Sequence, residues 1–435
     1  MFLKENEPKG KVFNMAIIAQ INLFDYCEIE KLGDLERLNL AFEGIDDEKL
    51  MEKLENKRKN GRDDYPVRVM WNLLIAMIVF EHKKVSTFRR ELSRNSQLRR
   101  KCGLCDYGKK KHLVPPSRVF SGFIRILSEE VEEIAEIFNV QVEELYELIP
   151  NFGKKLAGDG KYIDSYAKKA PKQNQTATDN RTENDAKWSI KEYHYADKKG
   201  EKKVKKEYHF GFKAHIICDV ETELPIAYSV TPANADEKSE MIKLLNSPLL
   251  SSEERRRIAE YLLLDRGYDS TDMIKAIKEA GIVPVIDIRN MWKDAEETKQ
   301  YKNTNMVYNY KGDVYYVDDN CEKHKMKYLG YDKQKKCLRY SHNQKTYKIY
   351  TSYDERIFLP IARDSKKWGR IYKGRTAVER LNGRLDRDYM FEEHTIRGLS
   401  KMSLMVGLSM IIMNGMAVGK IKNGKKMIRS LLNAA

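Results

Sequence analysis

The chain has 435 residues, enough for a large buried core and for two or three structural units. Lys and Arg total 80 against 65 Asp and Glu, a net charge of +15. This excess favours a polyanionic partner, because basic side chains release condensed counterions from phosphates, although an ordinary basic protein has the same composition. Six irregularly spaced cysteines exclude a disulfide framework, and the N-terminus has no apolar signal segment, so we expect a reducing, cytoplasmic location.

Helical patterns dominate residues 1–150, which we expect to form an all-α N-terminal domain. A buried helix is predicted over 67–80, a second from Ser86 to about Arg100, and a third after Pro116. The middle helix is strongly basic, with Arg89, Arg90, Arg94, Arg99 and Arg100. Three short helices with a basic middle one favour a helix-turn-helix-like unit in which these arginines contact DNA. A plain helical bundle with a solvated basic face fits nearly as well.

From about residue 155, short apolar runs alternate with helical stretches, the pattern of an α/β core. Residues 151–300 are assigned to its first part, with strands expected over 155–159, 209–219, 224–232, 261–265 and 282–288, and helices over 236–248 and 270–280. The lysine-rich stretch 168–207 is expected to be a mobile loop that contacts phosphate or only solvent.

The remaining chain divides into two parts. Residues 301–365 are rich in Tyr, Val and polar turns and predict a β-rich insertion, and residues 366–435 predict helices that complete the core, with a basic tail. Residues 402–418 carry no charge and approach the length of a membrane span, but Ser403, Ser409 and Asn414 dilute their apolarity. We therefore expect a helix buried in a protein core rather than a membrane helix.

Two aspartates follow apolar strands. Asp159 comes after KLAG and Asp265 after YLLL, so each is expected at the carboxyl end of its strand, where open α/β sheets place their active sites. Glycine-containing turns follow both residues. Each aspartate taken alone is more typical of a turn-forming cap than of a catalytic residue.

A third acid, Glu379, lies beside an apolar helical stripe, with Arg375 one turn before it. An ordinary Glu–Arg pair explains this spacing as well as a functional role does. If the three acids converge, their oxygens suit two Mg²⁺ or Mn²⁺ ions, and such a pair stabilises both oxygens of an in-line phosphodiester displacement.

The chain resembles bacterial insertion-sequence transposases of the DDE type, which have an RNase H-like catalytic core after a helical domain. The motifs are LAGDGKYI, HFGFKAHIICDVETELPIAYSVTPANADE, LLLDRGYDS and YKGRTAVERLNGRL. The resemblance implies that Asp159, Asp265 and Glu379 are the catalytic acids and hold two divalent ions. It also implies an α/β fold with an RNase H-like core, a β-rich insertion and an all-α N-terminal domain.

The glutamate motif of the family is Tyr, two residues, Arg, three residues, Glu, six residues, Lys. Tyr372, Arg375 and Glu379 fit it, but Asp386 stands at the lysine position. By this resemblance Tyr372 and Arg375 contact DNA. Arg384 or Arg387 could replace the missing lysine at a DNA phosphate. Lys213, two residues before His215, could approach DNA or instead orient the hairpin.

The resemblance implies cleavage and strand transfer at the terminal inverted repeats of the element, with double-stranded DNA as partner and a homodimer in the synaptic complex. A nuclease of the same fold without strand transfer and a catalytically inactive DNA-binding derivative remain alternatives. Zinc at Cys321, His324, Cys337 and His342 is disfavoured because the second pair lacks the usual spacing.

Overall fold

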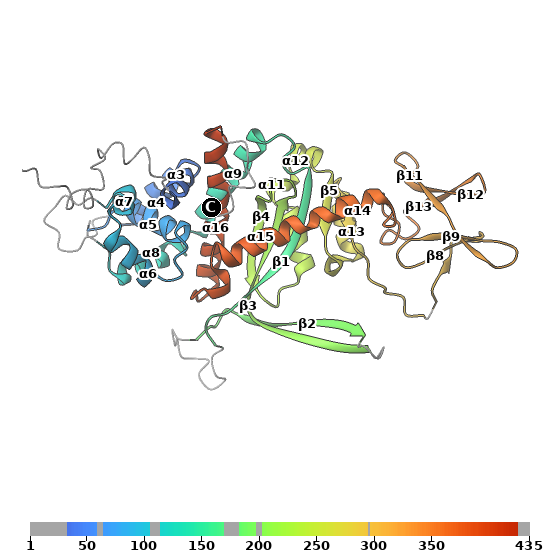
Figure 1. The fold of residues 1–435 in the computed structure, drawn as a ribbon, viewed down its shortest axis with the longest axis horizontal. Helices are drawn as coiled ribbons and strands as arrows, with labels where there is room; N and C mark the ends of the chain where they lie inside the picture. The colour runs from blue at the N-terminus through green and yellow to red at the C-terminus, as the bar shows by residue number, and fades with distance from the viewer. Residues whose placement is uncertain are drawn as a thin grey trace, which may run out of the picture.

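A computed structural model describes residues 33–58, 64–104, 114–168, 182–196, 202–294 and 296–424. The molecule is elongated: helices occupy one end, a twisted sheet lies in the middle, and two small sheets form the other end (Figure 1). The N-terminal helices are α3 (Asp34–Glu43), α4 (Glu48–Arg58), α5 (Val67–Val79), α6 (Val85–Arg94), α7 (Ser96–Lys101), α8 (Ser117–Leu127) and α9 (Val131–Leu148).

The predicted helix from Ser86 to Arg100 is wrong as a single element. The chain forms α6 and α7, which meet at Asn95. The Asn95 side chain accepts a hydrogen bond of 2.9 Å from the backbone N–H of Leu98 and caps α7. Asparagine is favoured at such a cap and disfavoured in a helix interior, so the helix is interrupted at Asn95. Helix α5 begins after Pro66, and α8 after Pro116, as predicted.

One long helix, α16 (Leu399–Lys422), lies between the N-terminal helices and the sheet (Figure 1). It packs against α3, α5, α9 and a strand of the sheet. A Cβ atom at Gly419 would lie 2.5 Å from the carbonyl oxygen of Leu40, so glycine permits the close approach of α3. Within the described residues, α16 is the helix that is long and apolar enough for a membrane span, but its apolar window is 89% buried. The prediction of a core helix is confirmed.

The central sheet contains β1 (Lys155–Asp164), β2 (Lys187–Ala196), β3 (Lys202–Asp219), β4 (Pro225–Pro232), β5 (Tyr261–Leu264) and β6 (Val283–Ile286). The strand order is β2-β3-β1-β5-β6, and β4 also pairs with β3. Strand β3 is antiparallel to its neighbours β1 and β4, whereas β5 and β6 run parallel to β1. The helices between β4 and β6 are α10 (Glu237–Leu245), α11 (Pro248–Ser251), α12 (Glu253–Ile258), the 3₁₀ turn η2 (Arg266–Tyr268) and α13 (Thr271–Glu279).

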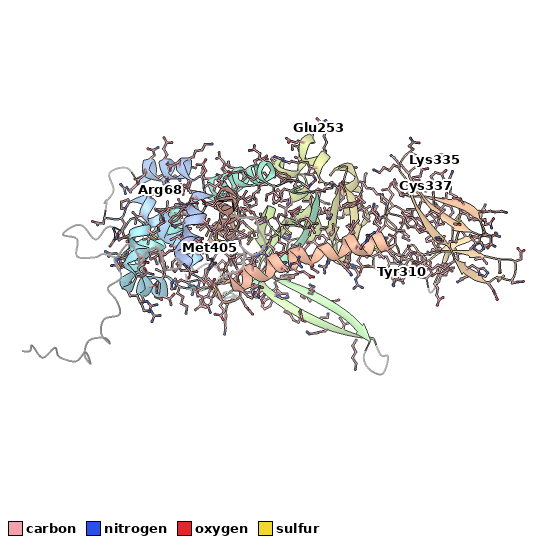
Figure 2. The ribbon with its side chains drawn as sticks, turned by 45° about the horizontal axis from the view of Figure 1, so that its top comes forward. Arg68, Glu253, Tyr310, Lys335, Cys337 and Met405 are labelled. Carbon is pink, nitrogen blue, oxygen red and sulfur yellow. The ribbon has the colours of Figure 1, made fainter. Side chains whose placement is uncertain are left out.

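The expectation of a loop over 168–207 is wrong for much of that stretch. Residues 187–196 pair with 202–211 in a β2–β3 hairpin, which projects beyond the sheet (Figures 1 and 2). The many lysines of this stretch hid the alternating pattern of a strand. Trp188 and Ile190 point to one face together with Tyr208 of β3, and all three are at least half-exposed. Residues 169–181 and 197–201 lie outside the described part of the chain.

Residues 299–350 form the predicted β-rich segment. Its strands are β7 (Lys299–Gln300), β8 (Met306–Tyr308), β9 (Val314–Val317), β10 (Lys323–Lys325), β11 (Lys327–Asp332), β12 (Cys337–His342) and β13 (Lys345–Tyr350). They make a four-stranded and a three-stranded sheet around a separate apolar core. Cys337 is buried in this segment (Figure 2), whereas Cys321 is exposed.

The chain returns from this segment through α14 (Lys366–Tyr372), the 3₁₀ turn η3 (Lys373–Arg375) and α15 (Thr376–Arg387), then the 3₁₀ turn η4 (Phe391–Glu393) and α16. Helix α15 crosses the sheet (Figure 1) and contacts β1 and β3. Its buried residues include Val378, Leu381 and Leu385, which lie at helical spacing. This packing brings the polar residues of α15 over the middle of the sheet.

Candidate active site

Asp159 lies in the middle of β1, not at its end as the sequence predicted. The strand continues to Asp164 because the GKYID segment remains paired with β3, with Asp159 opposite Ile216. Asp159 Oδ1 accepts a hydrogen bond of 2.9 Å from the backbone N–H of Gly160. Its Oδ2 accepts one of 3.1 Å from the side-chain amide of Asn382 on α15. The carboxylate is therefore held between the sheet and this helix.

Asp265 follows β5 directly, as predicted. Strands β1 and β5 are parallel, with Ala157 opposite Leu263, and two further steps of this register place Asp159 opposite Asp265. Asp265 Oδ1 accepts a hydrogen bond of 2.7 Å from the backbone N–H of Gly267 and caps η2. A Cβ atom at Gly267 would lie 2.7 Å from that oxygen, so a larger residue here would displace the Asp265 carboxylate.

The two aspartates influence each other electrostatically. Burial, and after it the negative charge of Asp265, raise the pKa of Asp159 to about 6, against the opposing effects of the Gly160 backbone hydrogen bond and the Arg375 guanidinium. Two carboxylates that face each other in a partly dry site repel when both are ionised. A positive charge between them would relieve this repulsion.

Glu379 lies on α15 with its side chain 48% exposed, and its Oε1 accepts a hydrogen bond of 2.5 Å from Arg375. It lies between Arg375 and Asn382, one turn from each, and both of those residues interact with Asp159. Glu379 is thus on the face of α15 nearest the aspartates, but it is turned toward Arg375.

The three predicted acids do not meet as closely as a metal-binding group does. Within the described residues, the three possible ligands whose atoms lie within 4.8 Å of one another are Asp318, Glu322 and His324, in the β-rich segment. The arrangement therefore joins Asp159 and Asp265 and leaves Glu379 beside them, paired with an arginine. A change in the Glu379 rotamer is needed before all three carboxylates can share an ion.

Arg384, expected as a DNA contact, is buried instead. Its guanidinium donates to the Glu223 carboxylate at 2.7 Å and to the Glu223 carbonyl oxygen at 2.8 Å, so it cannot reach DNA. Arg380 also donates to Glu223, at 2.6 Å. These bonds fix α15 to the β3–β4 turn. Arg387 is exposed, and among the described residues its one hydrogen-bond acceptor is the carbonyl oxygen of Gly383, at 3.3 Å. Of the two arginines proposed to replace the lysine, Arg387 is therefore the accessible one.

Asp386, at the lysine position of the family motif, pairs with Lys161 of β1 at 2.6 Å. Lys161 and Asp159 are two residues apart on a strand, so both face α15. Lys161 therefore lies beside α15, with its charge paired to Asp386. Sequence reasoning did not select Lys161 or Asn382, although DGK and the helical spacing of 379, 382 and 386 were the available signals.

Lys213 is also buried, contrary to its expected contact with DNA. Only 2% of it is exposed, and its Nζ pairs with Glu237 of α10 at 2.8 Å and lies 4.4 Å from the Tyr162 ring centre. His215 is fully buried, where its Nε2 contacts the Thr231 hydroxyl at 2.9 Å. These residues join α10 to the sheet on the face opposite α15, which agrees with the orienting role considered for them.

The predicted arginines of the N-terminal helices fall into two groups. Arg89 donates to the carbonyl oxygen of Pro115 at 2.8 Å, and Arg99 to that of Leu92 at 2.6 Å, so both connect helices. Arg90, Arg94 and Arg100 are exposed. Arg94 pairs with Glu91 at 2.6 Å, which leaves Arg90 and Arg100 as the exposed arginines of this set that have no acid partner among the described residues.

Tyr372 and Arg375 are not on one uninterrupted helix, because η3 lies between α14 and α15. The Arg375 guanidinium still lies 5.8 Å from the Tyr372 ring centre. Tyr372 stacks on Trp368 with ring centres 4.4 Å apart. Tyr372, Arg375 and Glu379 therefore do not lie along one face of a single regular helix.

The strand order and directions of β4, β3, β1, β5 and β6, with acids on the two central strands, define an RNase H-like core, which confirms the predicted fold class. A family described as the transposase DDE domain matches residues 163–414. The chain belongs to this family. The match begins four residues after Asp159 and includes Asp265 and Glu379.

A solved structure of a piggyBac transposase synaptic complex with hairpin DNA is similar at 12% identity, with a TM-score of 0.41 over 93% of this chain and 79% of that chain. No curated protein matches.

Replacing Asp159 with Asn is expected to stabilise the metal-free protein at pH 8 by about 1–2 kcal/mol, because the raised pKa means that folding disfavours the charged carboxylate. A raised native pKa adds stability below the unfolded-state value, and this is lost as the pH rises through about 6. The difference in melting temperature between variant and wild type should therefore shrink toward zero at about pH 4. An unchanged difference across this range would contradict the burial of charge at Asp159.

Proposed function

We propose that the protein is a DNA transposase that cleaves the terminal inverted repeats of its element and joins the freed 3′ ends to target DNA. The observation that carries this proposal is the proximity of Asp159 on β1 to Asp265, which directly follows the adjacent parallel strand β5, beneath the helix that bears Glu379. Membership of the transposase DDE domain family supports it. We place the reaction in the cytoplasm, on double-stranded DNA, with a homodimer holding two ends.

Two divalent ions fit the acids chemically, because carboxylate oxygens are the ligands that Mg²⁺ and Mn²⁺ prefer. Two buried polar atoms near Asp159 also have no hydrogen-bond partner among the described residues: the Tyr268 hydroxyl and Asn382 Oδ1. Such atoms indicate a site that a hydrated ion would complete. When bound, two ions would activate the attacking oxygen and stabilise the leaving 3′ oxygen of an in-line displacement.

The side chains of this chain have separate roles in the proposed reaction. Asp159 and Asp265 supply fixed negative charge at the centre of the sheet, and Asn382 orients Asp159. Arg375 holds Glu379 away from the aspartates until it exchanges this carboxylate for a DNA phosphate. The exchange would release Glu379 to join the aspartates and would link end binding to completion of the site.

Incubation of the protein with a duplex that carries its own inverted repeat and flanking DNA tests this function directly. We expect Mg²⁺-dependent cuts at the repeat boundary, no cuts in EDTA, and joined products when a target plasmid is present. Cuts without joining would favour a nuclease of the same fold. Sequence-specific binding without any cut would favour an inactive DNA-binding derivative.

Replacing Arg375 with Lys is expected to lower the cleavage rate by at least about tenfold, because an ammonium cannot form two parallel hydrogen bonds to phosphate. Single-turnover cleavage of a repeat duplex measures this. Arg387→Lys on the same helix is the matched control and should retain the wild-type rate. Full activity of Arg375→Lys would exclude a two-bond phosphate contact, and a fall in melting temperature with activity would indicate a structural pairing with Glu379.

A further inference from the structure

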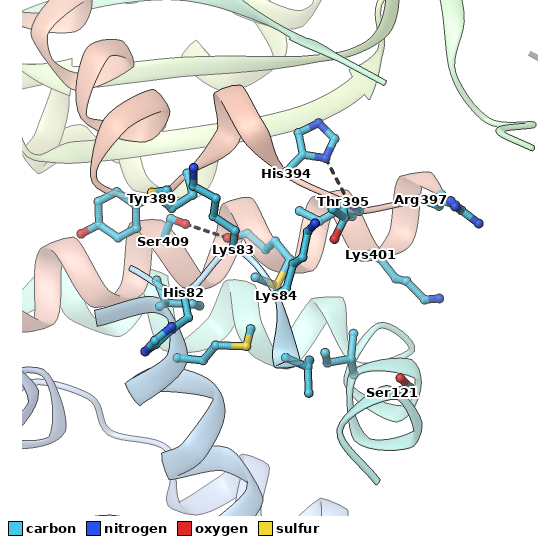
Figure 3. Close-up of a pocket in the computed structure, with 18 of the residues that line it drawn as sticks. His82, Lys83, Lys84, Ser121, Tyr389, His394, Thr395, Arg397, Lys401 and Ser409 are labelled. Carbon is cyan, nitrogen blue, oxygen red and sulfur yellow. Dashed lines mark hydrogen bonds between the residues drawn. The ribbon is translucent and has the colours of Figure 1, made fainter. Parts of the chain in front are cut away.

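A cavity of about 910 Å³ lies between the N-terminal helices and the catalytic core. Its walls come from the junction of α5 and α6, from α8, from residues 182–185 and 389–398, and from the first turns of α16 (Figure 3). Met77, Ile124 and Met405 contribute apolar surface. This size is typical of a ligand site rather than of a packing defect.

The acids in the cavity wall are already used. Glu183 is 3% exposed and accepts the backbone N–H of Gly398 at 2.8 Å, and Asp185 accepts that of Leu399 at 2.8 Å. Both carboxylates thus satisfy the free N–H groups at the start of α16. Their negative charge is directed at the helix end and is not available to a ligand. The third acid of the wall, Glu81, pairs with Arg37 at 3.5 Å.

Three cations in the wall have no such partner. Lys84 lies before α6, Arg125 on α8 and Lys401 on α16, and all three side chains are exposed. Their charged groups form no hydrogen bond or ion pair within the described part of the chain. Burial lowers the pKa of His82 and of His394, so these two histidines add little charge at neutral pH. The unused charge of the cavity is therefore positive, and it comes from elements of both halves of the molecule.

The cavity is tied to the strand that carries Asp159. His394 in its wall donates a hydrogen bond of 2.9 Å to the carbonyl oxygen of Asp164, the last residue of β1. Asp164 follows Asp159 by five positions along β1, a span of roughly 17 Å. Stacked base pairs rise by about 3.4 Å, so this span corresponds to roughly five base pairs of a DNA duplex that runs along β1.

We infer that this cavity binds the sugar–phosphate backbone of one DNA strand, roughly five nucleotides from the phosphate that is cleaved. The distance of five nucleotides rests on the proposed function, because it is counted from the phosphate that the active site would cleave. The three cations then neutralise phosphates of this strand, while the apolar floor accommodates sugar faces. A contact shared by both halves would also fix the helical end of the molecule relative to the active site.

The test uses a variant in which Lys84, Arg125 and Lys401 are all replaced by Gln, compared with wild type for binding to repeat and random duplexes across a range of salt concentrations. We expect affinity to fall at least about tenfold for both duplexes at 0.15 M salt. The slope of log affinity against log salt should decrease by about two to three, since each phosphate contact contributes about 0.9. Hydroxyl-radical footprinting should lose protection about five nucleotides from the cleavage position.

The matched control replaces Lys335, Lys345 and Arg339 by Gln, three exposed cations of the β-rich segment. An equal loss of DNA affinity in this control would overturn the inference, because it would show only a general effect of charge. An unchanged salt slope in the cavity variant would also overturn it. If the triple variant does not fold, the three single variants replace it, each with an expected slope decrease of about one. If the proposed function alone is wrong, wild-type protein will not cut the repeat duplex. The cavity variant will still show the lower affinity and the smaller salt slope.

Discussion

Asp159→Asn, Asp265→Asn and Glu379→Gln are each expected to reduce Mg²⁺-dependent cleavage of a repeat duplex by at least about a thousandfold, equivalent to about 4 kcal/mol in activation free energy. Each change removes one negative charge from the proposed ligand set with almost no change in shape. Binding of the repeat duplex should stay within a few-fold of wild type, because these acids do not contribute positive charge. Single-turnover cleavage and a parallel binding titration measure the two effects.

Asp164→Asn is the matched control, since Asp164 lies on the same strand but its side chain is 67% exposed and contacts His209. We expect this variant to cleave at nearly the wild-type rate. Activity in Asp159→Asn or Asp265→Asn would remove that residue from the site. Full activity in Glu379→Gln alone would leave a two-aspartate site and would mean that the observed Arg375–Glu379 pair is its working state.

Arg384→Met is expected to destabilise the folded protein by about 3–5 kcal/mol, because it leaves Glu223 as a buried charge with only Arg380 as partner. Glu223 is 6% exposed, so water cannot replace the lost hydrogen bonds. Urea denaturation monitored by far-UV circular dichroism gives the change. Cleavage should fall at temperatures where the variant is still folded, because α15 positions Glu379 and Asn382.

Arg387→Met lies one turn further along α15 and is exposed, so we expect its effect on stability to remain within about 0.5 kcal/mol. A double variant, Arg384→Met with Glu223→Met, should recover part of the lost stability, because replacing both partners of a buried pair removes the unpaired charge. Wild-type stability in Arg384→Met would mean that the pair does not anchor α15.

The arrangement of the core followed from the sequence where apolar runs were long and bounded by turns. YLLL before Asp265 favours a buried strand, and the length of the uncharged stretch 402–418 favours a buried or membrane helix. The extension of β1 to Asp164 was missed because GKYID is too polar to look like a strand, and its pairing with the long β3 supplies the hydrogen bonds that its side chains do not suggest.

The positively charged residues show a second limit of sequence reasoning. Lys213, Arg384 and Arg99 look like DNA contacts in a basic chain, but each is used inside the fold, by Glu237, by Glu223 or by a backbone carbonyl. Their partners are distant in sequence or belong to the backbone, so no spacing rule reveals them. The same holds for Lys161, whose pairing with Asp386 joins residues 225 positions apart.

The order of the elements along the chain also has a consequence for protein synthesis. Asp159 and Asp265 are made long before Glu379, which follows Asp265 by 114 residues, and ribosomes add roughly 5–20 residues per second. For several seconds or more the emerging chain therefore has two of its three acids but lacks α15 and α16, so the apolar surfaces of α3, α5 and α9 that α16 covers remain open. A chain that terminates before α15 has neither the third predicted acid nor a closed core, so under the proposed function cleavage requires that α15 and α16 have both been made.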